Sequence, residues 1–387
     1  MFRLGKQRKK IVALADVGSA SAAVAILQVE EGKPALILVA ERAFLPVGER
    51  SGEATASGVV QKLGEAGEAA LKKYTDNKRG RAGPIVASYV AIRTPWVRSK
   101  TTRVVSEFEK GTLVSGNTIS DLAKEALAQD KEFDHSNILE ANVIRTDLNG
   151  YPTHKPEGKH ARTVAVAVLL SECVPSIRTG VIETMSRLFP GAKPVVRSGV
   201  RTFLPVLHEY DLLPHNGIIA SVTDGTIDLI VVRKGLAAEH ELIPEGIKTI
   251  LKQAAPERPP EESLTLMRLL LSGGCEDAAC EAFKAALARI ELELVKKCGE
   301  VFGKLAAGRR IANTFILSTQ SEFAPWLSQF FSRIDFAQFT MTTQPFVVKT
   351  LTHDTLFTQV SYAPGVSFDI GLAICAALVN IEEHAGA

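Results

Sequence analysis

Two stretches of this chain, roughly two hundred residues apart, carry the same order of apolar and polar positions. In residues 11–29, apolar residues alternate with small or polar ones around Gly18, which predicts two short strands joined by a turn. Residues 218–250 predict a strand, a glycine turn, two more strands and an Ile-Pro-x-Gly start of a helix. The repeated hairpin predicts a duplicated α/β fold with two lobes.

Apolar periodicity also predicts the elements between and after these hairpins. Helices are expected over residues 57–74, 120–129, 174–188, 202–210, 262–271, 278–305, 323–331 and 370–379. Strands are expected over residues 34–45, 85–92, 101–108, 137–148, 163–170, 192–196 and 313–317, with two more before the last helix. A charged stretch with glycines at residues 75–83 marks a candidate domain boundary.

The order strand-strand-helix-strand-strand after this stretch predicts a small α+β subdomain inserted into the first lobe. The first lobe is therefore expected to comprise residues 9–83 and 171–212, and the insert residues 84–170. The second lobe is expected to comprise residues 213–387, including a helical subdomain at 245–310.

Composition narrows the class of protein. Hydrophobic residues make up 46% and charged residues 23% of the 387 residues, and a net charge of +2 gives no field that favours nucleic acid. Five scattered cysteines without a CxxC pair indicate neither a disulfide framework nor a zinc site, and favour a reducing cytosol. Apolar runs are too short to span a membrane, and the basic N-terminus (residues 3–10) is interpreted as a solvated tail rather than a signal peptide.

Residues 146–170 read TDLNGYPTHKPEGKHARTVAVAVLL, which is a turn at Asn149-Gly150, a Lys-Pro-Glu-Gly step and then a strand. This segment is similar to the one that closes the inserted SHS2 module in the bacterial actin-like family of the division protein FtsA and the pilus-assembly protein PilM. The chain resembles this family over nearly its whole length. The resemblance implies a duplicated actin-like, ribonuclease H-like fold with two lobes that close on a nucleotide and an SHS2 module inserted in the first lobe.

The first hairpin is similar to the family's first phosphate motif in Asp16-Val17-Gly18-Ser19. The resemblance implies that Gly18 lets the backbone approach a phosphate and that Ser19 and Ser21 add hydroxyl donors. Asp16 would hold Mg²⁺ through water, as hard oxygen ligands do.

The second hairpin matches the family only in part. The positions that match, and that would bind nucleotide if binding is retained, are Gly225, Thr226, Asp228 and one glycine of the helix start, Gly246. Ser221 stands where a metal-side carboxylate is expected, and Thr223 and Asp224 replace glycines. The glycine-rich adenosine loop is replaced by Leu-Ser-Thr-Gln-Ser-Glu at residues 317–322.

These departures favour a protein without catalytic residues, in which ATPase activity is weak or lost and ATP with Mg is a doubtful cofactor. We expect a cytoplasmic actin-like scaffold that assembles an inner-membrane machine, PilM-like in type IV pilus assembly or FtsA-like in cell division. The alternatives are an active, filament-forming ATPase and, from another class, a small-molecule kinase on the same fold.

The resemblance to PilM implies that the partner is a cytoplasmic peptide of an inner-membrane protein, bound in the groove between the first lobe and its insert. Self-association is left open, and no nucleic acid is expected. The protein is expected at the inner face of the cytoplasmic membrane, reached indirectly, because no amphipathic helix follows Val379. Trp96 and Trp326 are interpreted as packing residues or partner anchors.

Overall fold

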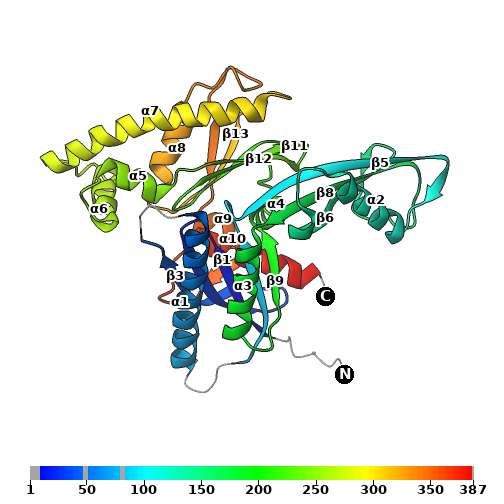
Figure 1. Cartoon of the computed structure of the whole chain (residues 1–387), viewed down its shortest axis with the longest axis horizontal. Coiled ribbons are helices and arrows are strands. Elements are labelled where there is room, and N and C mark those ends of the chain that lie inside the picture. Colours follow the sequence, from blue (N-terminus) through cyan, green and yellow to red (C-terminus); the bar gives the residue numbers. More distant parts are fainter. Residues whose placement is uncertain (1–8, 47–50, 79–82, 386–387) are drawn as a thin grey trace.

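The computed structural model describes residues 9–46, 51–78 and 83–385. Two lobes, each built on its own sheet, lie one above the other, and a smaller unit projects from one side (Figure 1). Most of the basic N-terminal stretch lies outside the described residues. Its last two members are described and form ion pairs, Lys9 with Glu30 and Lys10 with Glu383.

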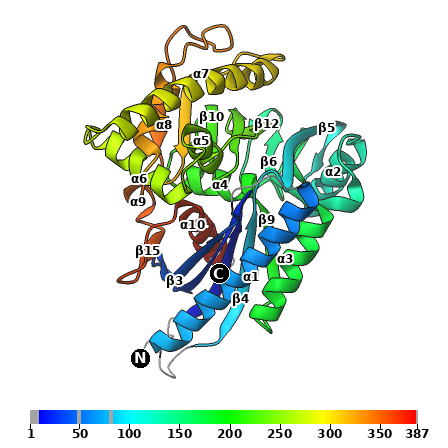
Figure 2. The same cartoon turned by 60° about the vertical axis from the view of Figure 1, so that its left-hand side comes forward.

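The sheet of the first lobe has six strands in the order β15-β3-β2-β1-β4-β9. Strands β1, β2 and β3 form an antiparallel meander. Strand β4 pairs in parallel with β1, and β9 pairs in parallel with β4. Strands β1 and β2 are almost entirely buried, because α1 and α3 pack side by side on one face of the sheet and α10 lies on the other (Figure 2). The bounds are β1 (Lys10–Val17), β2 (Ser21–Val29), β3 (Ala35–Phe44), α1 (Gly52–Lys78), β4 (Ile85–Ile92), α3 (Pro175–Leu188), β9 (Pro194–Ser198) and α4 (Gly199–Glu209).

Strand β4 shows that the insert boundary expected at residue 84 is wrong. This strand pairs in parallel with β1, from Val12 to Val17, in the middle of the first sheet. Residues 75–78 of the expected linker form the end of α1, and residues 79–82 lie outside the described residues. A stretch of charged residues predicts a boundary, but such stretches also occur where a helix ends in solvent before the chain returns as a buried strand.

The projecting unit is an antiparallel sheet in the order β5-β8-β6-β7 with α2 packed on one face. Its bounds are β5 (Val97–Leu113), α2 (Gly116–Gln129), a 3-10 turn η1 (His135–Asn137), β6 (Ile138–Leu148), β7 (Tyr151–Pro152) and β8 (His160–Cys173). The predicted Asn149-Gly150 turn joins β6 to β7, and both residues have positive φ, 52° and 86°. We refer to residues 97–173 as the insert.

The second lobe has a five-stranded sheet in the order β12-β11-β10-β13-β14. Its helices cover a core rich in phenylalanine, which includes Phe302, Phe315 and Phe331. The bounds are β10 (Asn216–Val222), β11 (Ile227–Arg233), β12 (Leu236–Ile243), α5 (Ile247–Ala254), α6 (Pro260–Leu271), α7 (Ala278–Ala306), β13 (Thr314–Ser318), α8 (Ala324–Arg333) and β14 (Val347–Thr350).

The C-terminal residues do not belong to the second lobe alone, which corrects the expected range of 213–387. After α9 (His353–Leu356), strand β15 (Val360–Tyr362) pairs in parallel with β3 of the first sheet. Helix α10 (Ile370–Ala385) is then buried between the first sheet and α4, in a core that also contains residues of the second sheet. A helix that is apolar on nearly all sides requires such a buried position.

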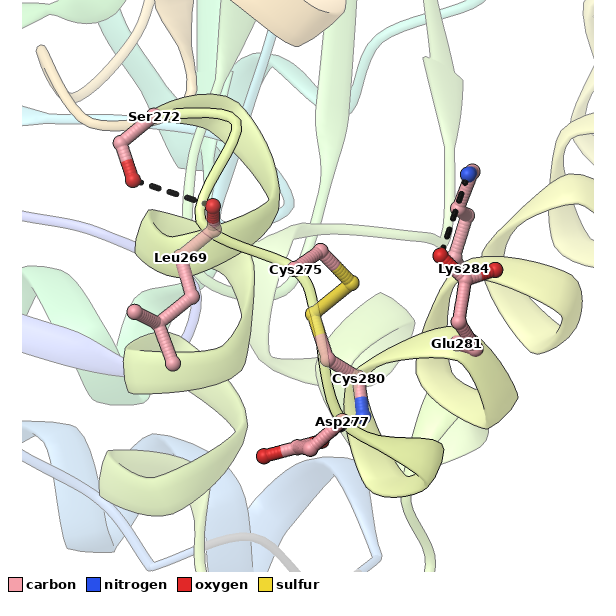
Figure 3. Close-up of a disulfide and its surroundings, with 7 residues drawn as sticks. All are labelled: Leu269, Ser272, Cys275, Asp277, Cys280, Glu281 and Lys284. Carbon is pink, nitrogen blue, oxygen red and sulfur yellow. Dashed lines mark hydrogen bonds and ion pairs between the residues drawn. A yellow bond between two sulfur atoms is a disulfide. The ribbon is translucent and has the colours of Figure 1, made fainter.

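Cys275 and Cys280 form a disulfide, which corrects the expectation that the cysteines are unpaired. The short connection between α6 and α7 brings their Cα atoms to 5.4 Å (Figure 3). The spacing fits no zinc site, but a tight turn before a helix is sufficient for a disulfide. The other cysteines, Cys173, Cys298 and Cys375, are free and buried. Cysteine usage therefore no longer indicates a reducing compartment.

Candidate functional site

The turns of the two hairpins face each other across the cleft between the lobes and are bonded directly. The Oγ atom of Ser19 accepts the N–H of Gly225 at 3.1 Å and lies 3.1 Å from the Oγ1 atom of Thr223. Thr223 Oγ1 also lies 2.9 Å from Thr226 Oγ1 within its own turn. A Cβ at residue 225 would lie 2.9 Å from the Ser19 hydroxyl, so glycine permits this approach. Groups that were expected to hold phosphate are therefore bonded to one another.

Further contacts fix the backbone of both turns. The indole N–H of Trp96 donates to the carbonyl of Gly18 at 2.7 Å, which gives this tryptophan a positioning role. Gly246 packs on the second turn so closely that a Cβ there would lie 2.4 Å from the backbone nitrogen of Thr226. The matching glycine at the helix start is thus explained by packing.

Two arginines, Arg93 buried and Arg42 partly buried, hold the carboxylate of Asp16. Arg93, which follows β4, donates to one oxygen of Asp16, and Arg42 on β3 donates to the other at 3.0 Å. Arg42 also donates to Asp369 at 2.6 Å and to the hydroxyl of Ser21 at 3.0 Å. Each oxygen of this carboxylate therefore accepts from a guanidinium group, and the two positive charges oppose a cation beside it.

Asp369 connects this ion network to the last helix. Its carboxylate accepts the backbone N–H of Leu372 at 3.0 Å at the start of α10, where the helix dipole favours a negative charge. Gly371 lies so close to Asp16 that a Cβ would meet its carboxylate oxygen at 2.3 Å. The N-terminus of α10 therefore closes the cleft from the side of the first lobe.

The pKa shifts of Arg42 and Asp369 both favour the charged forms of these two groups. Burial alone would lower the pKa of Arg42, but the carboxylates of Asp369 and Asp16 outweigh it and raise that pKa. Burial alone would raise the pKa of Asp369, but Arg42 holds it below its usual value. Burial raises the pKa of the Cys375 thiol beside Asp16 to about 12, so this group remains a neutral thiol.

A cavity of about 260 Å³ remains between the lobes beside the network. Its charged lining consists of the carboxylates of Asp16, Asp224, Glu322 and Asp369 and the guanidinium groups of Arg42 and Arg93. Glu322 is paired with Arg268 at 3.0 Å, so the other three carboxylates and the two guanidinium groups leave one negative charge in excess. Gln320, which stands in place of an adenosine-loop glycine, donates to Asp224 at 3.3 Å.

Asp228 lies away from this cavity, although it matches the family pattern. It is buried on β11, where its carboxylate pairs with the imidazole of His240 on β12. Burial alone would lower the pKa of His240, but the charge of Asp228 raises it above the usual 6.5. Asp228 is therefore a partner in a buried pair within the second sheet.

The structure brings together most of the residues predicted for the nucleotide site. Asp16, Gly18 and Ser21 line the cavity, and Ser19 contacts Gly225 in the turn that also holds Thr226. The sequence interpretation missed four residues that fill the site, which are Arg42, Arg93, Asp369 and Gly371. It singled out Trp96, but only as a packing residue or partner anchor. No sequence motif indicated these four residues, because they come from elements outside the two hairpins.

These residues do not fit Mg-ATP. The carboxylate that would face Mg²⁺ is neutralised by two arginines, and the two phosphate turns are bonded to each other. Phosphate oxygens would also face an excess of carboxylates, and like charges repel in a partly buried site. In the part of the chain that the structure describes, no group of three or more acidic, histidine or cysteine side chains is arranged to hold a metal ion.

A second cavity, of about 670 Å³, lies where the insert meets both lobes. We call it the insert groove. It is lined by Ile119, Val143, Ile144, Arg145, Thr146, Pro152, Thr153, His154, Pro156, His208, Asp211, Leu213, His215, Lys234, Gly235 and Leu236. These residues come from the insert, from the end of α4 and the segment after it, and from the turn between β11 and β12.

Comparison with known proteins supports the architecture. No protein-family model matches the chain, and no curated protein matches it. A chain of the PilM–PilN type IV pilus biogenesis complex is similar in structure over 96% of this chain and 98% of its own, with 13% identity and a TM-score of 0.56. The ethanolamine utilization protein EutJ from Carboxydothermus hydrogenoformans aligns over 98% of this chain and 92% of its own, with 12% identity and a TM-score of 0.44.

The protein has an actin-like fold. At this level of identity the similarity establishes the two-lobed architecture, and it confirms the fold class predicted from the repeated hairpins. Within the described residues, no helix is long and apolar enough to cross a membrane.

Removing one partner of the ion network should lower the free energy of unfolding. Asp369→Asn leaves the partly buried Arg42 with one carboxylate fewer, and we expect the free energy of unfolding to fall by about 2 kcal/mol. Urea denaturation measures this. Asp121→Asn, at an exposed pair with Lys124 on α2, is the matched control and should change stability by less than about 0.5 kcal/mol. Equal effects of the two substitutions would show that the network adds nothing.

The His240–Asp228 pair predicts a pH dependence of stability. The pKa of His240 is higher in the folded state than in the unfolded state, so its stabilisation is complete below pH 6.5 and is lost as the pH rises through the raised value. Urea unfolding of the wild type between about pH 6 and pH 9 should show a decline that His240→Gln lacks, with a slope of up to about 1.4 kcal/mol per pH unit. His353→Gln, at an exposed histidine, should keep the decline. Parallel curves for the wild type and His240→Gln would contradict the pairing.

Proposed function

We propose that this protein is a scaffold of an inner-membrane machine that works without nucleotide hydrolysis and is recruited by a cytoplasmic peptide of a membrane partner. The observation that carries the first part is the occupation of Asp16 by Arg42 and Arg93. In this proposal the guanidinium groups replace the metal ion of an actin-like site, and the bonded hairpin turns replace the phosphate chain. The insert is assigned to the SHS2 type on its resemblance to the FtsA and PilM family.

Recruitment by a peptide is supported by the fold and by the insert groove. A PilM chain in complex with PilN shares the architecture over nearly the full length of both chains. The groove lies beside the insert, where the resemblance to this family implied a peptide site, and the turn between β11 and β12 adds a wall from the second lobe. Type IV pilus assembly is the favoured setting, with cell division as the alternative, and the protein is placed at the inner face of the cytoplasmic membrane.

The first test is nucleotide binding. Isothermal titration with Mg-ATP should give no saturable heat, because binding has to break the contacts of Asp16 and separate Ser19 from Gly225. The small-molecule kinase and the filament-forming ATPase both require this binding. A micromolar dissociation constant, together with turnover that Asp16→Ala abolishes, would defeat the proposal.

The second test is the route to the membrane. Flotation with anionic liposomes should leave the purified protein in the soluble fraction, because a few basic residues contribute only about 1 kcal/mol each near an anionic surface. Deleting residues 1–10 should make no difference. Efficient flotation of the protein alone, abolished by that deletion, would show direct lipid binding in place of recruitment by a partner.

A further inference from the structure

One edge of strand β6 opens into the insert groove. On one side β6 pairs with β8 along most of its length. On the other side β7 pairs only with Asp147 and Leu148, and the N–H of Thr153 donates to the carbonyl of Thr146 at 2.9 Å. Across the described residues, no strand pairs with residues 143–145 on that side. Peptide groups along an open strand edge are a template for another extended segment.

The walls around this edge combine apolar and basic groups. Val143 exposes 36% of its surface, and the ring of Pro152 lines the groove nearby. The positive charges are Arg145 and Lys234, against the single lining carboxylate of Asp211. Three histidines, His154, His208 and His215, also line the groove and can donate hydrogen bonds through a ring nitrogen.

Lys234 is the cation best placed to meet a ligand. Arg145 already donates to Asp147 at 2.6 Å and to the backbone carbonyl of Lys234 at 3.0 Å. The carboxylate of Asp147 also pairs with the guanidinium of Arg103, at 3.4 Å. The two arginines around Asp147 therefore leave one positive charge in excess. Lys234 stands in the turn between β11 and β12, with φ of 53°, on the wall opposite β6.

We propose that the insert groove binds an extended acidic peptide segment, which adds as a strand to the open edge of β6 and places its carboxylates toward Lys234 and the histidines. This inference rests on the proposed recruitment by a peptide and specifies its chemistry. Main-chain hydrogen bonds supply affinity in strand addition, and alternate side chains supply specificity. The open edge is short, so charge complementarity has to discriminate between partners.

The experiment uses defined peptides and fluorescence anisotropy with the full chain. The probe is a fluorescein-labelled eight-residue peptide of alternating valine and glutamate, and its counterpart has lysine in place of glutamate. We expect the acidic peptide to bind at least about tenfold more tightly than the basic one, because like charges across an interface oppose binding. Lys234→Glu should weaken the acidic peptide about tenfold, whereas Lys131→Glu, at an exposed position elsewhere on the insert, should leave it unchanged.

Backbone methylation tests the strand pairing itself. In an added strand, alternate N–H groups point toward β6 and the others point away. Two acidic peptides, one methylated at the valine nitrogens and one at the glutamate nitrogens, should therefore differ, with one weakened about tenfold or more and the other close to the parent. Circular dichroism of both protein variants confirms that they remain folded.

Each contrary outcome has a distinct meaning. Equal binding of the two methylated peptides overturns strand addition. Tighter binding of the lysine peptide overturns the acidic preference but leaves recruitment by a peptide standing. No saturable binding of any peptide overturns the inference, and recruitment is then decided by whether the protein floats only with its membrane partner.

Discussion

The partly buried guanidinium of Arg42 is the constraint on which the centre of this molecule depends. It donates to Asp16 on β1, to Ser21 on β2 and to Asp369 at the start of α10. A buried charge is tolerated only when its hydrogen-bonding groups are satisfied. The first hairpin, β3 and the C-terminal helix therefore have to come together for any one of them to be stable in this arrangement. Arg93, which follows β4, donates to the other oxygen of Asp16 and adds the same requirement for a fourth strand of the first sheet.

Separate contacts join the two lobes. The lobes touch through Ser19 and Gly225, and Lys248 on α5 stacks over the ring of Phe44, 4.0 Å from its centroid. A ligand changes a conformational equilibrium only by its difference in affinity for the two states. In this structure the contact between the lobes is made by groups of the chain itself.

The sequence predicted the parts of the structure that depend on local periodicity. Both hairpins, the Asn149-Gly150 turn and the long helix α7 follow from spacing and turn chemistry alone. The sequence did not predict that β4 belongs to the first sheet, because the apolar pattern of a buried strand does not indicate which strand it pairs with. The position of β15 and α10 in the first lobe was missed for the same reason, since pairing between residues far apart in the chain leaves no local signal.

The residues of the candidate site were likewise predicted only in part. Substitutions at Thr223 and Asp224 were visible as departures from a motif, and they indicated a damaged phosphate site. The arginines that fill it were not visible, because a charged residue in a strand gives no sign of its partner. The Cys275–Cys280 disulfide was missed because it depends on how tightly the chain turns between α6 and α7.

The insert groove is larger than the cavity between the hairpin turns, about 670 Å³ against about 260 Å³. It opens between the insert, the end of α4 and the turn between β11 and β12. The insert is attached firmly. Glu140 on β6 accepts the backbone N–H of Ser198 at 3.1 Å at the start of α4, where a carboxylate is favoured by the helix dipole. Arg145 reaches the second lobe through the carbonyl of Lys234. A peptide that enters the groove therefore meets walls whose positions are already fixed, and pre-organisation of this kind reduces the entropy that binding costs.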